Sequence, residues 1–430
     1  MIKIENIQKL VNQNHIQHIN RLSAGLKASF GGTDLFQDWI IHEMHSMGIE
    51  VDEFNVDISE LTNQPGYQKT LHEKPQALNM AKNVVGIIHG QGPRQGMLLF
   101  GHADKRPETF EWAKTHPDME ETGGRFYGPG IADDVSGITA MLGAVDTYLQ
   151  LGIKPRGDLL IASILGKQGG IFGTFGLMKR YGPLDAAVYV HPAESGSGLA
   201  ELKIASLGSL EFIITLEGKG PDSTESMEAI YSKTAISATD LGMSLLAGLQ
   251  KWADEQSNRY QHKHLQELAG QSFSIVAGKF ISGIQNEIYK VSRKCTIQGI
   301  VCFPPNAQLN TVRSDFIQVY EYLVKQDPWL SQGHACLEWG DTIDESCQSD
   351  ENHPFMKMAS NTLMAVKGKT PNMHYGHTTS DIRYPLLYWK AQAFGIGPLC
   401  GDIGKETEWV DRGEYLDTIV VVTEMLKNAA

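Results

Sequence analysis

Short apolar runs alternate with longer amphipathic patterns along the first half of the chain. The near-continuous apolar runs at 83–90, 96–102, 158–165 and 185–191 predict buried strands. Between them, stretches such as 137–152 carry apolar residues at helical spacing and predict helices. Strands of this composition that alternate with helices are typical of a mostly parallel sheet covered by helices on both faces.

The pattern changes after residue 206. Six further segments read in the order strand, helix, strand, strand, helix, strand, at 209–218, 233–255, 272–283, 294–305, 309–326 and 334–340. This βαββαβ order predicts a small α+β domain. A helix at 353–368 and a strand at 391–397 then resume the first pattern.

The predicted architecture is therefore one α/β domain interrupted by a second, smaller domain. A chain of 430 residues is too long for one average core, which agrees with two domains. The expected boundaries are 1–206 and 346–430 for the interrupted domain, and 207–345 for the inserted one.

The amino-acid composition limits the classes of molecule that the chain is expected to bind. Lys and Arg number 37 and Asp and Glu 50, so the net charge is 37 − 50 = −13, which disfavours nucleic acid and anionic membranes. The first 22 residues lack the continuous apolar core of a signal peptide. The five cysteines are odd in number and have no CxxC spacing, so free thiols are expected. We expect a cytoplasmic protein that acts on a small molecule.

Candidate metal ligands follow the predicted strands. His102 and Asp104 end the run "LLFGHAD", His191 ends "AAVYVH", and Asp133 and Asp134 lie in the glycine-rich turn "YGPGIADDVSG". Ligands in such folds gather at the carboxyl ends of parallel strands. Two imidazoles and one carboxylate are a common ligand set for catalytic zinc, and Asp104 can accept a hydrogen bond from the far ring nitrogen of His102.

Each of these features also has an ordinary structural interpretation. A single histidine after a strand is more often hydrogen-bonded than a ligand, and "ADD" before a helix is usually an N-cap. Three such features at successive strand ends favour a metal site, present or former.

The stretches "GHADKRPETFEWAKTHPD" and "GGRFYGPGIADDVSGITAM" closely resemble the M20 family of metallopeptidases and amidohydrolases, especially its carboxypeptidase G2-like members. The resemblance continues through "GTFGLMKRYG" and "TSDIRYP" to "GKETEWVD" and covers most of the chain. It implies a catalytic α/β domain interrupted by a lid or dimerisation domain, a homodimer formed through that lid, and a centre of two zinc ions.

The resemblance assigns His102, Asp133 and His191 to one metal, with Asp133 as the bridging carboxylate. The family's acidic pair, a general base and a ligand of the second metal, falls on Lys167 and Gln168. The family's C-terminal histidine ligand falls on Gly404. The sequence therefore predicts either one bound Zn²⁺ or none.

Lys167 has three possible roles. Its ammonium group could neutralise Asp133 where a dication is missing, because a bare buried carboxylate is costly. A desolvated lysine can also act as a base or nucleophile, which makes Lys167 a candidate catalytic residue together with Asp104. Alternatively, Lys167 points into solvent in an inactive relative.

Three residues are candidates for substrate binding. The resemblance matches Asn286, in "QNEIYK", with the asparagine of the family's lid motif N-V-I-P. Arg383 could pair with a substrate carboxylate, although structural pairing inside the domain is an equal alternative. His377 is the third, and either His377 or Glu194 could replace the missing base.

Three hypotheses follow. The chain is an amidohydrolase or peptidase-like enzyme that acts on an amide bond of a small amino-acid-derived substrate with at most one metal. Alternatively, it is a non-hydrolytic enzyme that forms or rearranges an amide or transfers a proton through Lys167. The third alternative is a homologue without catalysis.

Overall fold

The computed structural model describes residues 2–56, 82–92, 94–167, 172–192, 195–222, 231, 234–283, 285–287, 290–376 and 380–429. Gln168, Glu194 and His377 lie outside the described residues. The chain forms two compact units. The large unit comprises Met1–Ala205, Gln348–His374 and Ser380–Ala430, and the small unit comprises Ser206–Cys347 and Tyr375–Thr379.

An eight-stranded sheet forms the centre of the large unit. Its strands, in spatial order, are β1 (Glu50–Asn55), β2 (Lys82–Ile88), β6 (Gly157–Ile164), β3 (Arg94–His102), β7 (Ala186–Val190), β16 (Gln392–Ile396), β8 (Glu201–Lys203) and β15 (Asn372–His374). Strands β6, β3, β7 and β16 run parallel to one another, which confirms the predicted mostly parallel sheet.

Strand β2 departs from the parallel pattern. It pairs antiparallel with both β1 and β6, although its sequence is as apolar as that of a central parallel strand. Its middle residues, Asn83 to Gly86, are buried. Burial of both faces, and not strand direction, therefore accounts for the apolar run.

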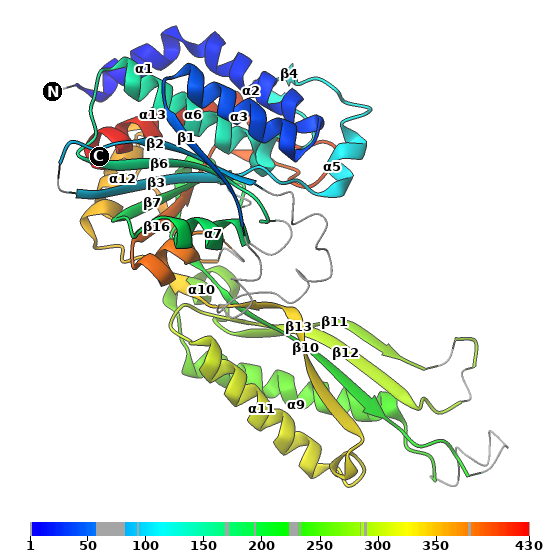
Figure 1. Cartoon of the computed structure of the whole chain (residues 1–430). Coiled ribbons are helices and arrows are strands. Elements are labelled where there is room, and N and C mark those ends of the chain that lie inside the picture. The colour runs from blue at the N-terminus through cyan, green and yellow to red at the C-terminus, as the bar shows by residue number, and fades with distance from the viewer. Residues whose placement is uncertain are drawn as a thin grey trace. The chain divides into compact units, whose positions relative to one another are not determined.

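Helices surround this sheet. They are α1 (Ile4–Gln13), α2 (His15–Phe30), α3 (Thr33–Ser46), α5 (Pro107–Trp112), α6 (Ser136–Gln150), α7 (Phe172–Arg180), α12 (Pro354–Lys367) and α13 (Arg412–Ala429). Helices α2, α3 and α6 lie along the same side of the sheet (Figure 1). Helix α6 is buried from Ser136 to Tyr148, as expected for a helix that is apolar on nearly every face.

A second, four-stranded sheet of the large unit joins distant parts of the sequence. Its order is β17 (Cys400–Gly401), β18 (Trp409–Asp411), β5 (Arg125–Tyr127) and β4 (Glu120–Thr122). Val410 of β18 pairs with Phe126 of β5. This pairing brings the segment "GKETEWVD" beside the turn that precedes α6.

The described residues of the small unit contain the predicted βαββαβ order together with the short helix α10. Its elements are β10 (Gly208–Glu217), α9 (Ala238–Arg259), α10 (Lys263–Ala269), β11 (Ser274–Ser282), β12 (Lys294–Phe303), α11 (Leu309–Gln326) and β13 (Ala335–Asp344). The antiparallel sheet has the order β11-β12-β10-β13, and α9 and α11 cover one face (Figure 1). Phe212, Trp252 and Phe316 pack together in its core.

The prediction for α9 was wrong at its start. The helix begins at Ala238 and not at residue 233, because Ile236 forms a β-bridge with Lys219. Ser237 then caps the helix, with its side chain accepting a hydrogen bond from the Asp240 main chain at 3.2 Å.

All five cysteines are free thiols. Within the described residues, every helix is too short or too polar to cross a membrane.

Candidate metal centre

Two strand ends and one turn bring His102, Asp133 and His191 together. His102 is the last residue of β3 and His191 follows β7, and these strands pair in parallel with Phe100 opposite Tyr189. Asp133 lies in the turn Ile131–Val135, which leads into α6 and in which the backbone of Asp133 and Asp134 is not helical. All three side chains are buried, and their ligand atoms lie within 4.8 Å of one another.

Both imidazole rings direct their Nε2 atoms toward the same carboxylate oxygen of Asp133. His102 Nε2 lies 2.8 Å from Asp133 Oδ1, and His191 Nε2 lies 3.1 Å from that oxygen. The Nδ1 atoms lie 3.1 Å from the Asp104 carbonyl oxygen and 2.7 Å from the Pro192 carbonyl oxygen, respectively. Because a carbonyl only accepts, each Nδ1 carries the proton, and the Nε2 lone pair of a neutral ring then faces Asp133. A cation among these atoms would satisfy all three, so the residues fit one metal ion.

Asp104 connects this ligand set to Lys167. The Asp104 carboxylate Oδ1 lies 3.5 Å from His102 Nδ1, farther than the main-chain oxygen of the same residue. The same Oδ1 accepts a hydrogen bond from the main-chain N–H of Lys167 at 3.2 Å. Asp104 thus contacts a metal-ligand candidate on one side and the altered segment on the other.

Charge is distributed unequally among the three ligands. Burial opposes the charged form of His102, but the attraction of Asp133 and hydrogen bonds to Asp104 and Asp133 outweigh it and raise the pKa of His102 to about 10. Burial lowers the pKa of His191 to about 3. Burial also opposes the charge of Asp133, yet His102 holds its pKa well below the usual range. Without a metal, His102 and Asp133 therefore form an ion pair beside a neutral His191.

Asp134 has a different role from its neighbour. Its Oδ2 accepts a hydrogen bond from the main-chain N–H of His102 at 3.2 Å, and burial raises its pKa well above the usual range. A Cβ atom added at Gly137 would lie 2.1 Å from Asp134 Oδ1, and one added at Gly101 would lie 2.6 Å from Oδ2. The two glycines leave room for a carboxyl group that supports His102 from behind.

Glu408 holds the turn that carries Asp133, and sequence reasoning missed this role. Its Oε1 accepts hydrogen bonds from the main-chain N–H groups of Ala132 and Asp133 at 2.7 and 2.9 Å. Its Oε2 accepts from the main-chain N–H of Gly404 at 3.0 Å. Burial raises the pKa of Glu408. The signal was its position inside "GKETEWVD", a segment that the resemblance already marked.

Two buried lysines support the other loops and were also missed. Lys203 Nζ donates to the carbonyl oxygens of His191 and Pro192 at 2.7 and 3.1 Å. Lys105 Nζ donates to the Gly130 carbonyl at 2.8 Å, and burial lowers its pKa to about 8. The sequence offers little to distinguish these lysines from exposed ones.

The resemblance assigns Lys167 to a position beside a second metal, but this side chain is a cation and not a metal ligand. Lys167 is half-buried. Burial has the largest effect on the pKa values of His102, His191 and Asp133. The positive charge of Lys167 has a smaller effect and lowers each of these three pKa values. This agrees with an ammonium group close enough to act on the retained ligands.

Gly404 has no side chain to offer a metal, and its backbone has φ +73°, which favours glycine. A Cβ atom built there would lie 2.9 Å from Nη1 of Arg106. A guanidinium group therefore lies against position 404, to which the resemblance assigns the family's histidine.

The described residues predicted to bind substrate belong to different units. Arg383 is buried in the large unit, with its guanidinium carbon 5.3 Å from the centre of the Tyr384 ring, and its charge acts on the buried Asp381. Asp381 accepts a hydrogen bond from Thr174 at 2.9 Å. Asn286 belongs to the small unit, where it has φ 65°.

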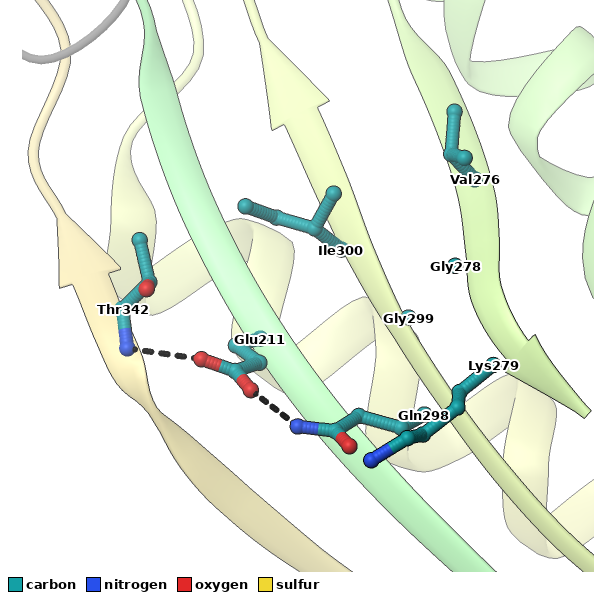
Figure 2. Close-up of a pocket in the computed structure, with 8 residues that line it drawn as sticks. All are labelled: Glu211, Val276, Gly278, Lys279, Gln298, Gly299, Ile300 and Thr342. Atoms are coloured by element: carbon teal, nitrogen blue, oxygen red, sulfur yellow. Dashed lines mark hydrogen bonds between the residues drawn. The ribbon is translucent and has the colours of Figure 1, made fainter. Parts of the chain in front are cut away.

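The small unit has a cavity of its own, of about 350 Å³, on its sheet (Figure 2). Glu211, Gln298 and Thr342 line it together with Val276, Ile300 and the backbone of two glycines. Glu211 accepts hydrogen bonds from Gln298 at 2.7 Å and from the main chain of Thr342 at 3.0 Å. Because the Glu211 carboxylate is engaged within the sheet, the buried cluster of the large unit is the stronger candidate site.

Comparison with known proteins indicates the family of the chain. The model of the peptidase family M20/M25/M40 matches residues 98–429. An N-formyl-4-amino-5-aminomethyl-2-methylpyrimidine deformylase of Halalkalibacterium halodurans is 23% identical over 369 residues, which is 79% of this chain and 81% of the relative. Carboxypeptidase G2 of a Pseudomonas species is 27% identical over 143 residues, 33% of this chain and 34% of the relative.

Solved structures share the fold at low sequence identity. Aminopeptidase PepT of Bacillus cereus superposes with a TM-score of 0.72 at 14% identity, over 96% of this chain and 98% of that one. The dipeptidase Dug1p of Saccharomyces cerevisiae superposes with a TM-score of 0.67 at 14% identity, over 99% and 98% of the two chains.

Proposed function

The chain belongs to peptidase family M20/M25/M40, and on that premise we propose that it hydrolyses an amide bond of a small amino-acid-derived substrate with a single metal ion. The retained ligands would be His102, Asp133 and His191. Relatives whose names describe a deformylase, a carboxypeptidase and a dipeptidase support an amide as the bond that is broken.

One observation carries this proposal. Both histidines turn Nε2 toward Asp133 Oδ1 while both Nδ1 atoms donate to main-chain carbonyls, so three ligand atoms converge within 4.8 Å. Zinc bound there would supply Lewis-acid chemistry, polarising a carbonyl group and making water more acidic.

The protein's own groups have defined tasks in this proposal. Asp104 and Pro192 fix the ring orientations through their carbonyl oxygens, and Glu408 fixes the turn of Asp133. Lys167 places a positive charge where negative charge develops on the substrate oxygen during attack on an amide. A protonated lysine donates but does not accept a proton, so the base is another group, for which His377 and Glu194 remain candidates.

The metal content of the purified protein tests the proposal directly. We expect about one zinc per chain by elemental analysis after exposure to zinc, and hydrolysis that a chelator abolishes and zinc restores. Hydrolysis that persists unchanged after complete removal of metal would contradict it.

A second candidate function rests on the charge of Lys167. The charge of Lys167 acts on all three ligands, and His102 and Asp133 already form an ion pair. The buried negative charge of Asp133 is therefore balanced without a dication. In that case, Lys167 would catalyse a non-hydrolytic step such as amide formation or proton transfer. Multiple turnover by metal-free protein that Lys167→Met abolishes would favour this candidate, and turnover unaffected by the substitution would exclude it.

We also propose that the chain forms a homodimer through the small unit. Its edge strand β11 leaves Val276 and Ile281 55% and 57% exposed, and an exposed apolar edge strand favours pairing with another strand. Analytical ultracentrifugation should give a dimer, and Ile281→Lys should shift it toward monomer. A parent protein that is monomeric at all accessible concentrations would contradict this assembly.

A further inference from the structure

The large unit has a cavity at the amino ends of two of its central strands. Its volume is about 360 Å³, which is within the range of small-molecule sites. Gly96 and Met97 line it from the start of β3. Asp185 and Ala186 line it from the start of β7. Because His102 ends β3 five residues after Met97, roughly 17 Å of strand separates this cavity from the candidate metal centre.

Apolar side chains form most of the described lining. Met97 and Phe355 are buried, and Met358 is half-buried. Pro354 and Met358 are four residues apart on α12, so the first turn of this helix presents them on one face and forms a wall of the cavity. A ligand of this cavity therefore gains from an apolar body that leaves water when it binds.

Asp185 carries the only fixed charge among the described lining residues. Its main-chain N–H donates to the Gly96 carbonyl at 3.1 Å, and its carbonyl oxygen accepts from the Gln392 main chain at 3.3 Å. These bonds fix its backbone between two strands. Its carboxylate forms no hydrogen bond or ion pair with any other described residue, so a cationic ligand would find it unoccupied.

Two further polar side chains line the cavity. Asn428 donates its side-chain amide to Glu424 at 2.9 Å, and its side-chain oxygen has no partner among the described residues. His353 Nδ1 accepts from the Phe355 main-chain N–H at 3.2 Å, so the ring that caps α12 is neutral and carries its proton on Nε2. Two acceptors and one negative charge thus face no competing positive charge from the described lining.

We propose that this cavity binds a small primary ammonium ion with an apolar body, an alkyl or aryl amine. The ammonium group donates to the Asp185 carboxylate and to the side-chain oxygen of Asn428, and the apolar body packs against Phe355 and Met358. The net charge of −13 favours the approach of a cation. The inference goes beyond the proposed function, since the candidate metal ligands take no part in it.

The test is isothermal titration calorimetry of full-length protein with phenethylamine at low ionic strength. We expect one phenethylamine per chain, and weaker binding as salt is added. 2-Phenylethanol keeps the apolar body without the charge, and ethylamine keeps the charge without the body. Each should bind at least about fivefold more weakly, because each loses one of the two contributions. The anion 3-phenylpropionate should not bind.

Three variants assign the binding to this cavity. Asp185→Asn should weaken phenethylamine binding by about fivefold, as expected for a solvent-exposed charge pair. Met358→Trp places a larger ring in the lining and should abolish binding. Asp34→Asn is the matched control, since it removes an exposed carboxylate of α3 that makes no hydrogen bond to its own helix, and it should leave binding unchanged.

Four outcomes would overturn the site. The parent protein could fail to bind phenethylamine, or it could bind 2-phenylethanol as tightly. Asp185→Asn, folded by circular dichroism, could bind like the parent. Finally, a folded Asp133→Asn variant could lose the binding, which would place the amine at the metal centre. Failure of the proposed function would appear separately, in zinc content and turnover, neither of which this titration measures.

Discussion

On one side of the centre, three buried side chains converge on a single oxygen of Asp133; on the other, Lys167 and Gly404 stand where the family resemblance places a carboxylate and a histidine. Both sides use the same backbone scaffold, because Glu408 holds the main chain of Asp133 and of Gly404 at once. The comparison shows that one carboxylate supports two sides of the centre whose side chains differ in charge. The side chains of the first side can bind a cation, whereas Lys167 and Arg106 on the second side are themselves cationic.

The largest effect is expected from a change on the retained side. Asp133→Asn keeps the shape of the side chain but removes its charge, so zinc affinity should fall by at least about a hundredfold, since even supporting groups of metal ligands contribute tenfold to a hundredfold. Zinc per chain, measured by elemental analysis after dialysis, checks this. Asp134→Asn is the matched control and should retain zinc, because burial already favours the neutral form of Asp134.

Rebuilding the altered side should produce a second metal site only under one condition. Lys167→Glu, Gln168→Glu and Gly404→His together restore the family's ligand types, but the new histidine would begin 2.9 Å from Arg106 Nη1. We expect one zinc per chain in this triple variant and two when Arg106→Ala is added. Two zinc ions in the triple variant itself would mean that Arg106 does not obstruct the position.

A smaller effect is expected where the two sides join. Glu408→Gln replaces one accepting oxygen with a donating amide group, which leaves a buried main-chain N–H unpaired and should cost about 1–3 kcal/mol of unfolding free energy. Denaturant unfolding of metal-free protein measures this change. The exposed Glu406→Gln serves as a control and should be nearly neutral. An equal change in both variants would contradict the assigned role of Glu408.

The smallest effect has the opposite sign. Removing the positive charge of Lys167, which acts on His102, His191 and Asp133, should tighten zinc binding by roughly twofold to fivefold in Lys167→Gln, because like charges repel across a partly solvated site. Competition with a zinc-sensitive dye measures the affinity. Weaker binding in the variant would indicate that Lys167 supports the ligands and does not oppose the metal.

Much of the fold follows from local patterns. The segment 309–326 was predicted as a helix, and α11 has the same bounds. Its apolar positions, its polar positions and its ends all indicate the same helix. The antiparallel direction of β2 was not predictable, since buried strands of either direction share one composition. The start of α9 depended on a bridge between Lys219 and Ile236, which are distant in the sequence.

Only the metal-ligand candidates of the site could be predicted, because few residue types bind metal ions. The structure brings His102, Asp133 and His191 together as the motifs predicted, because strand ends of a parallel sheet meet at one edge. Lys203 and Glu408 were missed, because their roles depend on burial and on main-chain partners. A single sequence does not reveal such partners for a charged residue.

Glu408 has a consequence for how such a protein changes over generations. Its carboxylate binds the main-chain N–H of Gly404, so this hydrogen bond does not depend on a side chain at that position. The backbone there has φ +73°, however, and a Cβ atom would lie 2.9 Å from Nη1 of Arg106. A change from glycine to histidine therefore strains the backbone and displaces Arg106, so evolution toward a ligand at 404 requires more than one mutation.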